Sequence, residues 1–204
     1  MDIIYIEQSL PRHKELSQRV SNITHTKYFG DGNRVWLHGA RTPKDLAGAL
    51  RAAIRDADLG DNFIISRDTT FVTGDFNPTQ AYHSLKSFWL RRKGLEQEAM
   101  VNTLRWLMEV GVGTKDYEVP VPRTFSKHLL SKTLEMMEGK PSMLLNTLHF
   151  NNYGFVPEPL PESMGDVILD QWTWNHVPPG PVVTLTETCY MHKDCINWIK
   201  SLEQ

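Results

Sequence analysis

Apolar and polar residues alternate with more than one period along the first third of the chain. Short apolar runs rich in β-branched and aromatic residues predict strands at Ile3–Ile6, Arg34–Leu37 and Phe63–Ile65. Apolar residues spaced four apart predict helices over Pro11–Val20 and Thr42–Ala57. Strands that alternate with helices in this way are typical of a three-layer α/β unit.

The second of these helices has a well-defined start. Thr42 suits the N-cap, Pro43 suits the first helical position, and Asp45 lies where a capping box requires an acid. Leu46 and Leu50 then begin an apolar stripe along one face of the helix. We therefore expect a stable amphipathic helix that packs on the sheet.

The middle of the chain predicts one more strand and several helices. Thr69–Thr73 predicts a strand, and Asn77 before Pro78 predicts the start of a helix. Residues 78–110 then form a predicted helical layer, which Gly94 ends or kinks. A further helix is expected over Thr124–Gly139.

The last part of the chain differs from the first because proline-rich loops separate its short apolar runs. These runs predict strands at Ser142–Phe150, Asp166–Trp174 and Pro181–Thr186, and the closing segment His192–Leu202 predicts a helix. We expect one domain over residues 1–204. Its α/β and helical part spans 1–140, and a β-rich subregion with a C-terminal helix spans 141–204, giving a mixed α/β (α+β) fold.

Composition is consistent with this architecture. The 204 residues are 40% hydrophobic and 23% charged, which is ordinary for a globular protein and excludes collagen-like, wholly disordered and coiled-coil proteins. The formal charge of -2 argues against broad electrostatic attraction of a nucleic-acid backbone. A chain with this net charge can still carry a local basic patch.

The expected location is the cytoplasm. The chain has only two cysteines, its first residues lack the positive charge of a signal peptide, and no apolar stretch is long enough to span a membrane. We therefore expect no membrane partner.

The familiar nucleotide-binding and hydrolase fingerprints are absent from the sequence. It contains no GxxxxGK[ST] loop, GxGxxG turn, GxSxG elbow or HExxH pair. The usual forms of P-loop ATPases, Rossmann dehydrogenases, serine hydrolases and zincins are therefore excluded.

A cluster near the C-terminus combines aromatic and titratable side chains. In an extended segment, Asp170, Trp172, Trp174 and His176 share one face because side chains alternate along a strand. Two indoles between a carboxylate and an imidazole would form a stacking platform for a base, a nucleoside or a sugar. The alternative is that both tryptophans fill a core and that His176 caps the strand end.

Three further polar residues are candidates for the site. His149 and Asn152 lie at the predicted end of the strand Ser142–Phe150, where α/β folds often place functional groups, although Asn and Gly there also suit a turn. Asp75 follows the Thr-rich strand and would orient a histidine or hold a divalent metal, the one cofactor class we consider. Turn formation alone also explains Asp75.

An anion site is expected where the capped helix begins. Arg41 precedes Thr42, and the first turn of a helix offers N–H groups and the positive end of the helix dipole. We expect phosphate to bind there.

Cys189, His192 and Cys195 lie three residues apart and share one helical face. The spacing is compatible with part of a zinc set, but a second pair of ligands is missing, so we assign no metal residues and favour two small apolar side chains in a helix.

Together these features predict an intracellular enzyme, a hydrolase or transferase, that acts on a phosphorylated nucleotide-like or nucleic-acid ligand. Arg41 would hold phosphate, Trp172 or Trp174 would stack on a ring, and His149 or His176 would serve as acid or base with Asp75. The alternative is a non-catalytic module that docks a partner protein through its Trp- and Pro-rich C-terminal surface.

Overall fold

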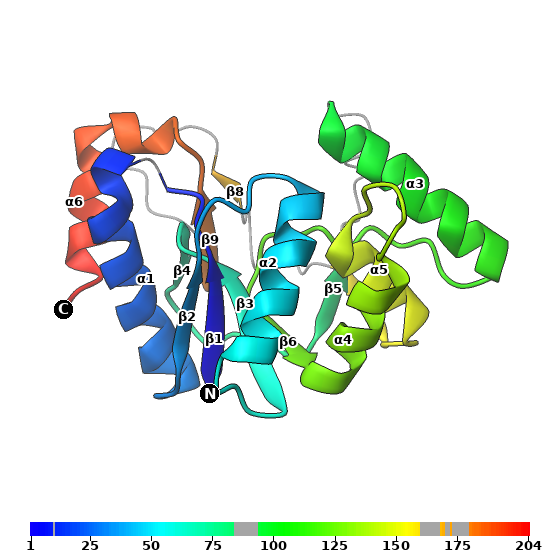
Figure 1. The fold of residues 1–204 in the computed structure, drawn as a ribbon. Helices are drawn as coiled ribbons and strands as arrows, with labels where there is room; N and C mark the ends of the chain where they lie inside the picture. The colour runs from blue at the N-terminus through cyan, green and yellow to red at the C-terminus, as the bar shows by residue number, and fades with distance from the viewer. Residues whose placement is uncertain (10, 84–93, 160–167, 170–171, 173–179) are drawn as a thin grey trace.

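A four-stranded sheet forms the centre of the molecule (Figure 1). The computed structural model describes residues 1–9, 11–83, 94–159, 168–169, 172 and 180–204. The strands, in spatial order, are β2 (Arg34–Leu37), β1 (Asp2–Ile6), β3 (Asn62–Arg67) and β6 (Arg123–Ser126). β1 is parallel to both β2 and β3, whereas β6 is antiparallel to β3.

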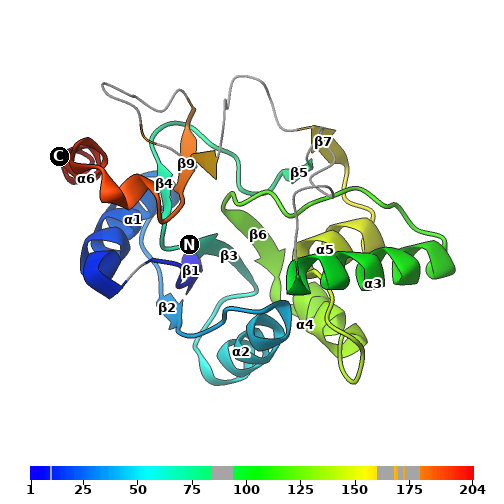
Figure 2. The ribbon, with the colours of Figure 1, turned by 90° about the horizontal axis from the view of Figure 1, so that it is seen from above.

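Helices lie on both sides of this sheet, as Figures 1 and 2 show. They are α1 (Lys14–Phe29), which follows the 3-10 turn η1 (Pro11–His13), α2 (Pro43–Asp56), α3 (Leu95–Val110), α4 (Lys127–Met136), α5 (Leu145–Asn152) and α6 (Lys193–Ser201), which follows the 3-10 turn η4 (Cys189–Met191). α1 and α6 lie together on one side, and α2 and α4 pack against each other on the other.

Alternation along the strands separates the two faces of the sheet. Ile3, Tyr5 and Ile64 pack with Phe29 of α1 on one face. Their neighbours Ile4, Phe63 and Ile65 belong to the larger core beneath α2, α4 and α5. Because successive side chains of a strand point to opposite faces, one short apolar run supplies both cores. The mixed α/β fold class and the three layers of the N-terminal unit are confirmed.

Two smaller sheets involve the later part of the chain. β4 (Thr70–Val72) pairs with β9 (Val182–Leu185), which also pairs with β8 (Ile168–Leu169), and β5 (Ala81–His83) pairs with β7 (Pro157–Pro159). The β4–β9 pairing joins residues more than a hundred positions apart in one core with α1 and α6. Cys189 and Cys195 are buried thiols in that core.

Several predicted elements are confirmed. The strands at Ile3–Ile6 and Arg34–Leu37 are present, and the helix after Thr42 has the full capping box. The first helix is longer than predicted, since it continues to Phe29, which the polar pattern after Val20 did not indicate. The C-terminal helix is also present.

The helix predicted to begin at Pro78 is wrong over its first residues, where β5 lies instead. The Asn77 side chain accepts hydrogen bonds from the backbone N–H of Thr79 at 3.0 Å and from its hydroxyl at 2.7 Å. This local turn uses the Asn77 oxygen that would otherwise cap a helix. Residues 84–93 lie outside the described residues, and α3 occupies the later part of the predicted layer.

The strand predicted at Ser142–Phe150 is also wrong, because α5 occupies most of it. Partners distant in the sequence hold the start of this helix: the Thr103 hydroxyl accepts from Leu144 N at 2.8 Å, and Glu118 accepts from Thr147 N at 2.9 Å. Similarly, the predicted helix Thr124–Gly139 begins only at Lys127, since residues 123–126 pair with β3 as β6.

Of the strand predicted over Asp166–Trp174, the described residues contain β8 alone. Within the described part of the chain, no helix combines the length and the apolar character needed to cross a membrane.

Candidate functional site

A pocket lies beyond the carboxyl ends of β1 and β3, and we call it the edge pocket. Its volume is about 170 Å³. Its walls come from the ends of both strands, the start of α2, residues 118–121 and the start of α5, and they include Ile6, Arg41, Thr42, Arg67, Glu118 and Arg123. The chain leaves β1 toward β2 on one side and returns to β3 on the other, so the pocket lies at the switch point of the sheet, where α/β folds bind ligands.

The start of α2 forms one wall of the edge pocket. Thr42 Oγ1 accepts from Asp45 N at 3.1 Å, and Asp45 Oδ2 accepts from Thr42 N at 3.2 Å. The capping box therefore uses N–H groups that the sequence suggested for an anion, and the Asp45 carboxylate offsets part of the helix dipole. Positive charge at this pocket comes instead from arginine side chains.

The charged side chains in the lining favour an anionic ligand. They are three arginines, Arg41, Arg67 and Arg123, and two glutamates, Glu96 and Glu118. Arg41 is exposed at the rim, whereas Arg123 is buried. The excess of one positive charge and the two different depths of the arginines suit a ligand with phosphate or carboxylate groups.

Glu118 is held firmly in this pocket. Its two oxygens accept from Thr147 N at 2.9 Å and from the Asn146 side-chain amide at 3.1 Å. These contacts cap the N-terminus of α5, which is a structural role. A carboxylate oxygen has more than one acceptor position, so the same side chain is also equipped to take a proton from a ligand.

Asp68, next to Arg67, organises the loop after β1. Its carboxylate accepts from Gln8 N at 2.7 Å, Ser9 N at 3.1 Å and the Ser9 hydroxyl at 2.6 Å. Burial raises the pKa of Asp68, and the contacts with Ser9 and Gln8 oppose that rise. Asp68 therefore fixes the course of the chain beside the edge pocket.

Among the described residues that the sequence predicted for a site, Arg41 alone lines the edge pocket. His149 is buried between α4 and α5, with Nδ1 2.7 Å from the Thr133 hydroxyl, and it does not line the pocket. Burial is the larger cause, and the positive charge of Arg123 the smaller one, of the lowering of the pKa of His149 to about 3. The structure thus separates His149 from Arg41, and its acid–base role stays a prediction.

Asp75 and Asn152 also lie away from the edge pocket lining. Asp75 is exposed between β4 and β5, and Asn152 at the end of α5 donates to Met136 Sδ at 3.8 Å. These two residues and Arg41 are therefore not brought together.

Trp172 packs in the core. It is 5% exposed, and its ring centroid lies 5.4 Å from that of Trp198 in α6. This placement agrees with the alternative in which the tryptophan fills a core, and it leaves little indole surface for a ligand or a partner protein. Asp170, Trp174 and His176 lie outside the described residues.

The Cys189, His192 and Cys195 group does not converge on one point. Both cysteines are buried, whereas His192 is exposed. Across the described ranges, no three His, Cys, Asp or Glu side chains are placed to hold a metal ion.

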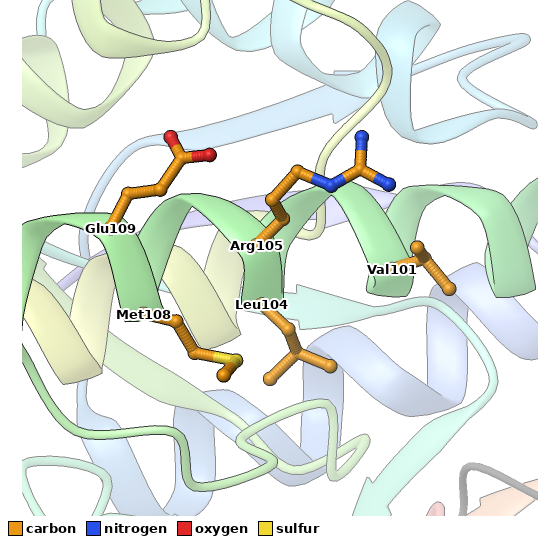
Figure 3. Close-up of a pocket in the computed structure, with 5 residues that line it drawn as sticks. All are labelled: Val101, Leu104, Arg105, Met108 and Glu109. Atoms are coloured by element: carbon orange, nitrogen blue, oxygen red, sulfur yellow. The ribbon is translucent and has the colours of Figure 1, made fainter.

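A second hollow lies on the outer surface of α3 (Figure 3). Leu104 and Met108 project from one side of the helix, and Arg105 and Glu109 project from the other. The described residues that line this hollow all come from α3. Within the described part of the chain no second element brings polar groups toward it, so these residues do not form the convergent set of a small-molecule site.

Sequence reasoning missed Arg123, Glu118 and Asn146. Arg123 and Phe125 share the buried face of a short strand, which marks Arg123 as an inward-facing cation once the strand is known. The prediction of a helix over that segment concealed the alternation.

Comparisons with known proteins give a limited result. No family model matches the sequence, and no curated protein matches it. The chain is similar to the solved structure of the galactosyltransferase LgtC in complex with donor and acceptor sugar analogs, with 12% identity, a TM-score of 0.45, and coverage of 100% of this chain and 95% of that one. An active-site mutant of LgtC gives 12% identity, a TM-score of 0.44, and coverage of 99% and 95%.

Proposed function

We propose that this chain is an enzyme that binds a phosphorylated, nucleotide-like small molecule in the edge pocket. The observation that carries the proposal is the place of the pocket, at the switch point beyond two parallel strands with three arginines in its lining. Phosphate oxygens are strong acceptors, and arginine is the side chain best suited to them.

A small molecule suits the pocket better than a nucleic-acid duplex. A cavity of about 170 Å³ is smaller than the roughly 300–1,000 Å³ typical of sites for whole drug-sized ligands. It therefore holds the charged part of a nucleotide and leaves the rest at the surface. The formal charge of -2 gives no general attraction for a polyanion.

Glu118 is the proton acceptor that we assign to the reaction. It lies in the pocket lining, and its hydrogen bonds to Thr147 and Asn146 fix the carboxylate. A fixed general base beside a bound phosphate ester suits a hydrolase or a transferase, because each reaction needs a hydroxyl or a water molecule to lose a proton.

Binding of nucleotides tests the proposal directly. Isothermal titration of the full chain with a nucleoside, its monophosphate, its diphosphate and a sugar-linked diphosphate should show binding only of the phosphorylated compounds. Arg41→Gln should weaken binding a few-fold, because an exposed ionic contact is worth about 0.2–1 kcal/mol.

Arg55→Gln is the matched control, since Arg55 is an exposed arginine of α2 outside the edge pocket lining. Its affinity for each compound should equal that of the unmodified chain. Equal affinities of the Arg41 and Arg55 variants, or no binding of any phosphorylated compound, would overturn the proposal.

A further inference from the structure

Arg123 is a buried cation in the wall of the edge pocket. The residue is 1% exposed and pairs with Ile65 near the carboxyl end of β3. Its Nη2 donates to the carbonyl oxygen of Tyr82 at 2.6 Å. Among the described residues, its Nε and Nη1 have no hydrogen-bond partner. Buried donors without partners are uncommon in folded proteins, because each one loses its hydrogen bonds to water without replacement.

Aromatic rings compensate only part of this charge. The guanidinium carbon lies 4.9 Å from the ring centroid of Phe150 and 6.0 Å from that of Tyr117. A cation–π contact is weaker than the cost of burying a charge without a hydrogen-bonded counter-ion. The rings therefore offset only part of the cost of burying Arg123.

No carboxylate within the described residues forms an ion pair with Arg123. Every ion pair between described residues involves side chains other than Arg123, and the hydrogen bonds described for Glu118 join it to Thr147 and Asn146 rather than to Arg123. Burial lowers the pKa of Arg123 to about 10, and the charge of Glu118 opposes the decrease. Arg123 thus stays protonated at neutral pH.

We propose that Arg123 binds an oxyanion group of the ligand, phosphate or carboxylate, through the N–H groups of its guanidinium, of which those on Nε and Nη1 are unused in the described contacts. This inference rests on the proposed function because it uses the same pocket. Both nitrogens lie below the pocket surface, so the guanidinium turns toward the pocket to meet the oxyanion. The turn exchanges a hydrogen bond to a neutral carbonyl oxygen for hydrogen bonds to an anion, in which both partners are charged.

The depth of Arg123 distinguishes its role from that of Arg41. A contact with exposed Arg41 stays in water and is weakened by salt, whereas a contact with Arg123 forms away from water. Arg123 is therefore expected to supply most of the affinity for the anionic group, and Arg41 a smaller part.

Simple oxyanions test this role without knowledge of the full ligand. Titration of the full chain with inorganic phosphate, pyrophosphate and malonate should show binding of at least one, and the comparison decides between phosphate and carboxylate. Arg123→Gln should lower that affinity about tenfold or more, because a buried charge-assisted hydrogen bond is lost. The affinity of the Arg123→Lys variant should lie between that of the unmodified chain and that of the Arg123→Gln variant, since lysine keeps the charge but not the donor geometry.

Arg51→Gln is the matched control. Arg51 is a partly buried arginine whose Nη2, like that of Arg123, donates to a backbone carbonyl, that of Leu134, but it does not line the edge pocket. This variant should bind the oxyanion as the unmodified chain does. Loss of affinity in both variants to the same extent would indicate a general structural effect and overturn the inference.

A measurement on the unmodified chain covers the case in which Arg123→Gln does not fold. The Nε resonance of Arg123 in a nitrogen NMR spectrum should shift when the oxyanion is added, and the resonance of Arg51 should not. An unchanged Arg123 resonance at saturation would overturn the inference.

The two proposals fail in different ways. If a nucleoside diphosphate binds, and a folded Arg123→Gln variant binds it equally well, the role of Arg123 is wrong and the proposed function stands. If Arg123 binds an oxyanion but no nucleotide binds, the proposed function is wrong and the oxyanion site stands.

Discussion

Two buried histidines remain neutral in the folded chain. Burial lowers the pKa of His25 to about 4 and that of His149 to about 3. His25 is held by Ser21 O at 2.7 Å on Nδ1 and by the Ser66 hydroxyl at 2.8 Å on Nε2. The ordinary histidine pKa of about 6.5 applies to the unfolded chain. Protonation therefore favours unfolding over the interval between these values.

The free energy of unfolding should accordingly fall as the pH falls below about 6.5. Between that value and the pKa of the folded state, the unfolded chain binds a proton that the folded chain excludes, and each such group costs about 1.4 kcal/mol per pH unit. Urea unfolding at a series of pH values between about 7.5 and 4.5 measures this slope.

Replacement of His25 by Gln should reduce the slope, even though the variant is less stable at neutral pH. His128, which is exposed on α4, provides the control, and the His128→Gln variant should keep the slope of the unmodified chain. An unchanged slope in the His25→Gln variant would contradict the assignment.

At the scale of elements, two glycines have opposite roles. A Cβ atom at Gly32, just before β2, would lie 2.6 Å from the carbonyl carbon and oxygen of Met1 and 2.8 Å from Asp2 N. A Cβ atom at Gly48, inside α2, would have no described atom within 4 Å outside its chain neighbours and its own helix backbone. The first glycine permits the close approach of the chain to β1, and the second has no such function.

Gly32→Ala should therefore destabilise the chain by about 2 kcal/mol or more, because backbone atoms cannot move aside easily. Gly48→Ala should stabilise it by about 0.5–1 kcal/mol, since alanine is the better helix former. Urea unfolding of both variants measures whether each substitution lowers or raises the free energy of unfolding. If Gly32→Ala were as stable as Gly48→Ala, the close approach of Met1 and Gly32 would be wrong.

Elements with local signals were predictable from the sequence, and elements set by distant partners were not. The capping box of Thr42 and the β-branched run of β1 depend on adjacent residues. By contrast, α5 depends on Thr103 and Glu118, which lie far from it in the sequence. β6 forms because β3 needs a partner along its edge, and no pattern within residues 123–126 indicates that pairing.

The same distinction applies to the candidate site. Arg41 was predictable because its place follows from the helix that begins after it. Arg123 reaches the edge pocket only through the antiparallel pairing of β6 with β3, so a sequence pattern does not reveal it. The predicted strand Ser142–Phe150 put His149 near a strand end. The segment is mostly helix α5, and His149 is therefore buried between helices.

At the scale of the whole molecule, the two ends of the sequence share one core. α1 packs against α6, and β4 pairs with β9, so Val20 and Phe71 meet Val183 and Ile199 in the same cluster. Contacts between such distant segments form late when a chain folds, because loop closure must come first. The core therefore depends on the C-terminal segment returning to the N-terminal half.

The two cysteines make this return measurable by chemistry. Cys189 and Cys195 are both 0% exposed, the Cys189 thiol donates to Leu169 O at 3.0 Å, and burial raises the pKa of Cys195 to about 12. Only an exposed thiolate reacts with a thiol reagent. The rate of labelling by a disulfide reagent should thus report the separation of α6 from α1. If α6 separates before the rest of the chain unfolds, this rate should rise at urea concentrations below the main unfolding transition. Labelling as fast as that of an exposed thiol under native conditions would contradict the buried placement, whereas slow labelling would let Cys189 and Cys195 record how often this core opens to solvent.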